Sequence, residues 1–148
     1  MDAEKDKSIG FLIGYLTRQA HRYFELEFAN HGLNRGSIFI LKRLYWSDGI
    51  RQQDLSKNLH FDKANITRLV RKLQEQGFVQ KLPDKKDKRA YRIFLSEKAR
   101  EFQPVFEDIF NGWGKIIATD FTSKEEQNLW QYLNKMSTNS EQYFKEHK

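Results

Sequence analysis

The chain contains no cysteine among its 148 residues. A disulfide scaffold, a zinc site with cysteine ligands and direct redox sensing by a thiol are therefore excluded. The four histidines also lack a recognisable metal-ligand spacing, although His21 and Glu25 lie four residues apart. Ordinary polar or capping roles are favoured for these histidines, so we expect no metal and no other cofactor.

Long hydrophobic runs and catalytic motifs are absent as well. The apolar stretch from Ile9 to Leu16 is too short and too interrupted for a membrane span or a secretory signal. The sequence therefore predicts a cytoplasmic protein. It contains no nucleophile motif, no glycine-rich phosphate loop and no histidine–carboxylate set at catalytic spacing. We do not expect an enzyme.

The positive charge of the chain is concentrated in one segment. Between Arg51 and Arg92 there are twelve lysines and arginines but only five acids. This segment therefore has a net charge of +7. The net charge of the whole chain is +6, so the residues outside the segment sum to −1. Local basicity on an otherwise balanced protein is typical of a surface that binds nucleic acid.

A helix with two unlike faces is predicted between Asp62 and Gln76, with Asp62 as its N-cap. Four apolar residues recur at helical spacing and predict a buried stripe: Ile66, Leu69, Val70 and Leu73. The opposite face carries small, hydroxyl and guanidinium groups with no acid among them: Ala64, Thr67, Arg68 and Arg71. Such a helix can pack on one side and contact DNA on the other.

A charged hairpin is predicted directly after this helix. Gly77 ends the helix, residues 78–82 and 91–95 are predicted as strands, and the turn between them is rich in lysine and arginine. Residues 52–58 are predicted as the helix that precedes the two-faced one. This order is typical of a winged helix-turn-helix, whose recognition helix enters the major groove and whose hairpin reaches the neighbouring backbone or minor groove.

The wing and the residues after it resemble the MarR/SlyA family of bacterial and archaeal transcription regulators. Residues 87–89 match the family's Asp-x-Arg, and residues 95–99 match its Leu-Thr-x-x-Gly. Two departures occur, Ser96 in place of threonine and Ala99 in place of glycine. Serine caps a helix as well as threonine does, and alanine is the better helix former, so neither departure argues against DNA binding. The similarity covers nearly the whole chain.

The resemblance implies a mainly α-helical fold with a small β-hairpin wing, in a single domain over residues 1–148. The winged helix-turn-helix would span about residues 34–96. Helices at about 7–31 and 97–146 would form a homodimer. The apolar stripes at both ends of the chain exceed what a small winged helix can cover, which also favours burial against a second copy.

Two groups of residues are expected to contact double-stranded DNA. On the recognition helix they are Lys63, Ala64, Asn65, Thr67, Arg68 and Arg71. On the wing they are Lys85, Lys86, Asp87, Lys88 and Arg89. An arginine can bind guanine with two hydrogen bonds, and the methyl groups of Ala64 and Thr67 can contact a thymine methyl. By resemblance, Arg89 enters the minor groove with Asp87 orienting it, while the wing lysines contact phosphates.

The resembling family also binds effectors such as phenolic carboxylates between its DNA-binding and dimerisation helices. The side chains available for an anionic effector in the first helix are Arg18, His21 and Arg22. Three other functions stay open: a sequence-tolerant architectural DNA-binding protein, a small-molecule sensor with secondary DNA binding, and a winged-helix protein-interaction module. The last would not need the local charge of +7.

Overall fold

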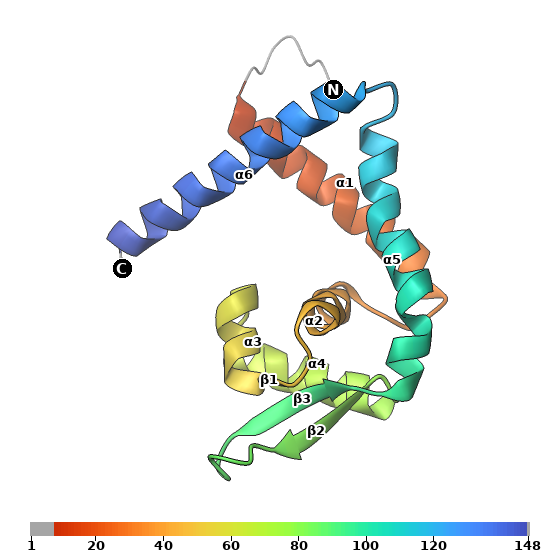
Figure 1. The fold of residues 1–148 in the computed structure, drawn as a ribbon, viewed down its shortest axis with the longest axis vertical. Coiled ribbons are helices and arrows are strands. Elements are labelled where there is room, and N and C mark those ends of the chain that lie inside the picture. Colours follow the sequence, from red (N-terminus) through yellow and green to blue (C-terminus); the bar gives the residue numbers. More distant parts are fainter. Residues whose placement is uncertain (1–7, 148) are drawn as a thin grey trace. The chain divides into compact units, whose positions relative to one another are not determined.

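The computed structural model describes residues 8–147 (Figure 1). Over this range the elements are α1 (Ile9–Ala29), α2 (Arg35–Trp46), β1 (Ile50–Arg51), α3 (Gln52–Leu59), α4 (Lys63–Glu75), β2 (Val79–Pro83), β3 (Tyr91–Leu95), α5 (Glu97–Ile117) and α6 (Ser123–Glu146). The expected mainly α-helical fold with a hairpin wing is confirmed. Residue 7, where the first dimerisation segment was expected to begin, lies outside the described residues, as do the two ends of the expected domain. No helix within residues 8–147 is long and apolar enough to cross a membrane.

The chain divides into two compact units between Asn111 and Gly112, inside α5. The first unit contains α1 to α4, the sheet and the larger part of α5. The second contains the end of α5 and α6. A capping box begins α6: the Thr122 hydroxyl accepts a hydrogen bond from the Glu125 amide, and the Glu125 carboxylate accepts one from the Thr122 amide.

The sheet of the first unit has the strand order β1-β3-β2, and both neighbouring pairs are antiparallel. In Figure 1, β2 and β3 form a hairpin that extends beyond the helices of this unit. The first wing strand begins one residue later than expected, because the Phe78 amide still donates to the Leu73 carbonyl at 2.9 Å and closes the end of α4. Gly77, at φ +75°, makes this turn without the steric cost that a side chain would add.

Two packed regions hold the first unit together. The expected stripe of α4 is fully buried, and α2 approaches it so closely that a Cβ at Gly36 would lie 2.6 Å from Leu69. Four phenylalanines join α1 to α5, with ring centroids 5.1 Å apart for Phe28 and Phe106 and 5.2 Å apart for Phe24 and Phe110. Burial of a phenylalanine ring contributes about 2–3 kcal/mol of apolar transfer free energy, so these contacts stabilise the packing of α1 against α5.

Candidate nucleic-acid interface

The turn between α3 and α4 sets the direction of the recognition helix. His60 ends α3 in the left-handed region at φ 53°, and the Ser56 hydroxyl donates to the Phe61 carbonyl at 2.5 Å. Asp62 then caps α4 as expected, because its carboxylate accepts a hydrogen bond of 2.8 Å from the Asn65 amide. The cap and the turn together fix the N-terminal end of α4, where a recognition helix approaches base edges.

The face of α4 opposite the buried stripe is exposed to solvent. Lys63, Ala64, Thr67, Arg68 and Arg71 are all exposed, and Asn65 is half-buried. The Arg68 guanidinium donates to the Asn65 side-chain oxygen at 2.9 Å, which holds it along the helix.

One part of the expectation for this face is wrong. Glu75 lies beside it, with its carboxylate 3.7 Å from the Arg71 guanidinium. The pair is separated by four residues, the spacing at which helical side chains are neighbours. An acid therefore stands at the C-terminal end of the exposed face, and Arg71 has an ionic partner that Arg68 does not share.

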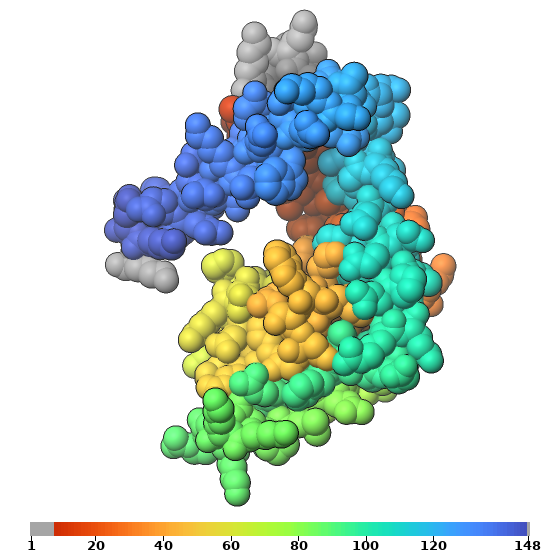
Figure 2. All heavy atoms as spheres, in the orientation of Figure 1, coloured from red at the N-terminus to blue at the C-terminus, as the bar shows by residue number. Residues whose placement is uncertain are grey.

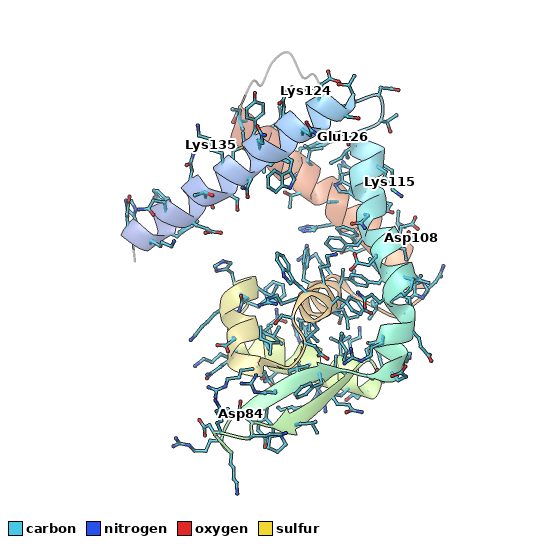
Figure 3. All side chains as sticks on the ribbon, in the orientation of Figure 1. Asp84, Asp108, Lys115, Lys124, Glu126 and Lys135 are labelled. Atoms are coloured by element: carbon cyan, nitrogen blue, oxygen red, sulfur yellow. The ribbon has the colours of Figure 1, made fainter. Side chains whose placement is uncertain are left out.

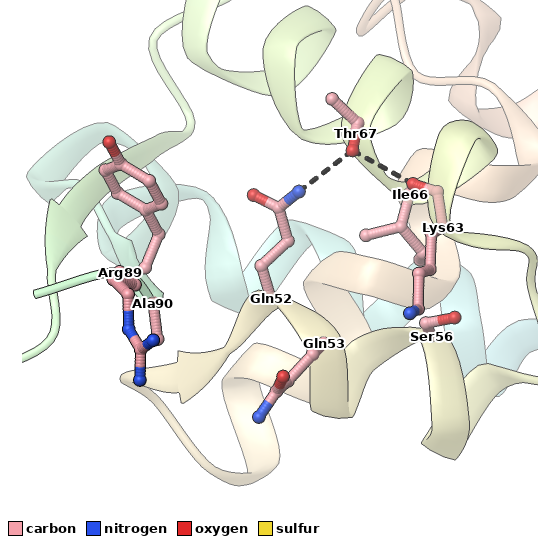
Figure 4. Close-up of a pocket in the computed structure, with 9 residues that line it drawn as sticks. Gln52, Gln53, Ser56, Lys63, Ile66, Thr67, Arg89 and Ala90 are labelled. Atoms are coloured by element: carbon pink, nitrogen blue, oxygen red, sulfur yellow. Dashed lines mark hydrogen bonds between the residues drawn. The ribbon is translucent and has the colours of Figure 1, made fainter. Parts of the chain in front are cut away.

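A hollow of about 270 Å³ brings the recognition helix and the wing together (Figure 4). Its lining comes from α3, α4, the wing turn and the first residue of β3: Gln52, Gln53, Ser56, Lys63, Ile66, Thr67, Arg89, Ala90 and Tyr91. Lys63 and Arg89, expected in two separate groups of DNA contacts, thus border one space. The contribution of α3 was not foreseen, because its lining residues are uncharged and give no signal in the charge pattern.

Asp84 is the anchor of the wing, although it lies in the charged turn of a surface hairpin (Figure 3). Only 2% of the residue is exposed. One carboxylate oxygen accepts from the backbone amides of Lys86 and Asp87 at 2.8 and 3.1 Å. The other accepts from Arg51 at 3.0 Å and Arg92 at 2.5 Å. The Lys86 amide, supported by these other donors, holds the pKa of Asp84 well below its ordinary value.

The register of the sheet explains why an acid is needed at this position. Arg51 and Arg92 lie directly opposite each other in the antiparallel pair of β1 and β3. Like charges at opposed positions destabilise a sheet unless an anion lies between them. The Asp84 carboxylate is that anion, so two of the twelve cations of the basic segment form ion pairs with an acid of the protein itself.

The tip of the wing is exposed. Figure 2 shows the hairpin turn standing out from the surface of the first unit, and Lys85, Lys86 and Lys88 are exposed there. The Arg89 side chain is 93% exposed, and its Nε lies 3.4 Å from the Asp87 carboxylate, which also accepts from the Arg89 amide at 3.1 Å. Asp87 therefore contacts Arg89 in the way expected of an orienting residue. That Arg89 enters the minor groove stays a prediction.

The expected effector residues lie on α1. Arg18 and Arg22 are exposed, and the Nδ1 atom of His21 lies 3.1 Å from the Arg35 guanidinium. They line neither the hollow described above nor a second one beside Arg43, Trp46, Ser47 and Asn58. Their role stays a prediction. Residues 8–147 contain no group of three or more histidine, aspartate or glutamate side chains that could hold a metal ion.

Comparisons of the sequence and of the structure with known proteins agree with each other. A sequence model of the MarR family matches residues 33–91. An uncharacterized HTH-type transcriptional regulator of Bacillus subtilis strain 168, YybA, is 30% identical over 129 residues, 87% of this chain and 86% of that protein. A MarR transcriptional regulator from Methanosarcina mazei Go1 has a TM-score of 0.88 at 34% identity, over 91% of this chain and 97% of that chain. A MarR protein from Peptoclostridium difficile has a TM-score of 0.87 at 31% identity, over 97% and 94%.

The first two of these relatives are named as transcriptional regulators. The similarity to YybA covers 87% of this chain, and that to the regulator from Methanosarcina mazei covers 91%. The chain therefore belongs to the MarR family of helix-turn-helix transcriptional regulators, which bind DNA.

Proposed function

We propose that this regulator binds a pseudo-palindromic DNA site as a homodimer, with α4 of each protomer in a major groove and each wing in the adjacent minor groove. The observation that carries the proposal is the shared hollow, in which Lys63 of α4 and Arg89 of the wing border one concave surface. A duplex that lies against this surface meets the exposed face of α4 and the wing tip together. The two half-site centres would lie about one helical turn, roughly 34–36 Å, apart.

Exposed apolar side chains at both ends of the chain support the homodimer. They lie on α1, on the last turn of α5 and on α6: Ile9, Phe11, Ile13, Leu16, Ile116, Ile117, Trp130, Leu133 and Phe144. Single exposed apolar residues are ordinary, but exposed apolar residues that recur along three helical segments favour a contact surface on each of them. A symmetric dimer buries the same group twice and presents two recognition helices to one duplex.

Selection of bound sequences from a random DNA pool tests the proposal. We expect two inverted half-sites at a fixed spacing, and tight binding that survives competition by unrelated DNA at physiological salt. If the selected sequences share no half-site, or if unrelated DNA competes equally well, the protein is an architectural DNA-binding protein instead.

Removal of the wing arginine tests the minor-groove contact. Arg89→Ala should weaken binding to the selected site about tenfold or more, because a guanidinium in a narrow minor groove meets an enhanced negative potential. The unfolding temperature should stay unchanged, since the side chain is 93% exposed. Both quantities can be measured by fluorescence anisotropy and calorimetry. Parental affinity in a normally folded Arg89→Ala protein would show that the wing does not contact DNA.

Base reading and phosphate binding can be separated with two substitutions. Arg68→Lys keeps the charge but loses the fork that binds guanine, so it should cost about 1–3 kcal/mol on the selected site and little on scrambled DNA. Lys86→Ala removes one phosphate contact, so it should weaken both DNAs equally and lower the salt slope by about one unit. Titrations of each variant with both DNAs over a salt series give these quantities. Equal losses on both DNAs for Arg68→Lys would mean that Arg68 does not read bases.

Regulation by a small aromatic or anionic effector is the second part of the proposal. It is supported by the exposed cations Arg18 and Arg22 and by His21 within the same turns of α1. A shift of the unfolding temperature on addition of a phenolic carboxylate, with loss of that shift in Arg22→Gln, is the corresponding test.

A further inference from the structure

The hydroxyl group of Thr67 is already engaged within the protein, although Thr67 lies on the exposed face of α4. It donates its proton to the Lys63 carbonyl at 2.9 Å and accepts a hydrogen bond from the Gln52 side-chain amide at 3.0 Å. A hydroxyl has only one proton to donate. Thr67 therefore has no proton left for the acceptor atoms that bases present in the major groove.

Gln52 belongs to the other helix of the motif and reaches across to α4. Figure 4 shows the Thr67 oxygen turned toward Gln52 and Lys63, and the Thr67 methyl group turned away from both. With its NH₂ group toward Thr67, the amide donates to an oxygen whose own proton points to the Lys63 carbonyl, so the two hydrogen bonds are compatible. The other amide atom, Gln52 Oε1, is enclosed and has no hydrogen-bond partner among the described residues. In the position in which its NH₂ group donates to Thr67, the amide oxygen of Gln52 therefore accepts no hydrogen bond from the described residues.

Building on the major-groove docking of α4 proposed above, we infer that Gln52 is a positioning residue for base recognition. By donating to the Thr67 oxygen, Gln52 holds the hydroxyl turned toward α3 and leaves the methyl group, which points away, as the part of Thr67 that contacts DNA. The matching group on DNA is the C5-methyl of thymine, the one apolar group that distinguishes a base edge in the major groove. Thr67 would thus specify thymine by apolar contact, and Gln52 would prevent the hydroxyl from accepting a different base.

Two substitutions test the methyl group and the hydroxyl group of Thr67 separately. Thr67→Val keeps the methyl and removes the hydroxyl, whereas Thr67→Ser keeps the hydroxyl and removes the methyl. On the DNA, deoxyuridine in place of thymidine removes only the C5-methyl group. Each thymine of the selected site is replaced in turn by deoxyuridine, and the affinities of parent and variants are compared.

At one thymine per half-site, the uridine replacement should weaken the parent about fourfold, the value of one buried methyl group. Thr67→Val should lose the same factor at the same position. Thr67→Ser should bind thymine and uracil there equally. A Thr67→Ser protein that keeps the parent's sensitivity at every thymine, or a Thr67→Val protein that loses it, would overturn the role of the methyl group.

The positioning role of Gln52 has its own test. Gln52→Ala removes the hydrogen bond that holds the Thr67 oxygen toward α3, so the side chain can turn its hydroxyl to the DNA. The sensitivity to uracil at that position should then fall, and other bases should be tolerated. In the double variant Gln52→Ala/Thr67→Val there is no hydroxyl to free, so the full sensitivity should return. A residue with a merely structural role would not show this rescue, and unchanged sensitivity in Gln52→Ala overturns the assignment.

The same measurements separate this inference from the proposed function. Uracil sensitivity that does not follow Thr67, on a protein that still prefers its selected site over scrambled DNA, overturns the inference and leaves the proposed function intact. Equal binding of the parent to selected and scrambled DNA overturns both.

Discussion

Replacement of Asp84 by asparagine is expected to lower the unfolding temperature by about 5–10 °C and to weaken DNA binding about tenfold. The change removes one charge and alters almost no volume. Its effect should nevertheless be large, because the carboxylate is 2% exposed and accepts hydrogen bonds from two amides and two arginines. A buried acid that is removed leaves its partners with uncompensated charge.

Asparagine has only one side-chain oxygen, so it cannot accept hydrogen bonds both from the two backbone amides and from the two arginines. Its side-chain oxygen can still accept from the Lys86 and Asp87 amides, but its NH₂ group then faces the N–H groups of Arg51 and Arg92. Donors would meet donors, and two opposed guanidinium groups would repel each other across β1 and β3. The hairpin that carries Arg89 would lose its side-chain link to β1, which is why DNA affinity should fall together with stability.

Calorimetry at fixed protein concentration and DNA titration measure the two effects. Asp87→Asn is the matched control, because it removes a carboxylate from the same turn whose arginine partner is exposed, and it should hardly change the unfolding temperature. An unfolding temperature in Asp84→Asn equal to that of the parent would mean that the buried cluster does not hold the wing.

The depressed pKa of Asp84 predicts that the effect of Asp84→Asn on stability depends on pH. Because this pKa is depressed in the folded protein, the ionised carboxylate stabilises the fold at neutral pH. As the pH falls below about 4, the unfolded chain takes up the proton first, and the stabilisation is lost. The stability difference between the parent and Asp84→Asn should therefore shrink in acid.

Local patterns in the sequence were sufficient to predict the recognition helix. The four apolar residues of α4 are all buried, Asp62 caps the helix, and β3 spans residues 91–95 as expected. Each of these features depends on residues within a few positions of one another. Helical period, capping chemistry and strand propensity act over that range.

The features that the sequence did not predict depend on contacts between distant residues. Asp84 seemed to be one more charge in a surface turn, because its burial follows from the register that sets Arg51 opposite Arg92. The bond from Gln52 to Thr67 joins two helices, and the angle between them cannot be read from either one. Glu75 beside Arg71 is different, since its spacing of four residues was visible in the sequence.

A charge placed on the apolar face of α6 is expected to abolish the homodimer. Leu133→Glu should raise the dimer dissociation constant about a hundredfold or more, because the symmetry of a dimer introduces every substitution twice. Leu133 is 49% exposed within one chain, and Trp130, three residues before it, is 68% exposed. In the proposed dimer both side chains are covered, and a carboxylate there would be buried without a partner.

DNA binding should fall with the dimer. When one protomer is bound, its partner is held beside the second half-site at a high effective concentration, and a monomer loses this advantage. Affinity for the full site should therefore drop to that for a single half-site. Affinity for an isolated half-site should change little, because α4 and the wing are far from Leu133 in the sequence and belong to the other compact unit.

Sedimentation at micromolar concentration and titration with full and half sites measure these effects. Gln131→Glu is the matched control: it adds the same charge to the same helix two residues away, at an exposed polar position, and should leave the protein dimeric with normal affinity. A dimeric Leu133→Glu protein would remove α6 from the interface. A parent protein that sediments as a monomer, yet binds its full site as one unit, would require a different account of how two half-sites are recognised.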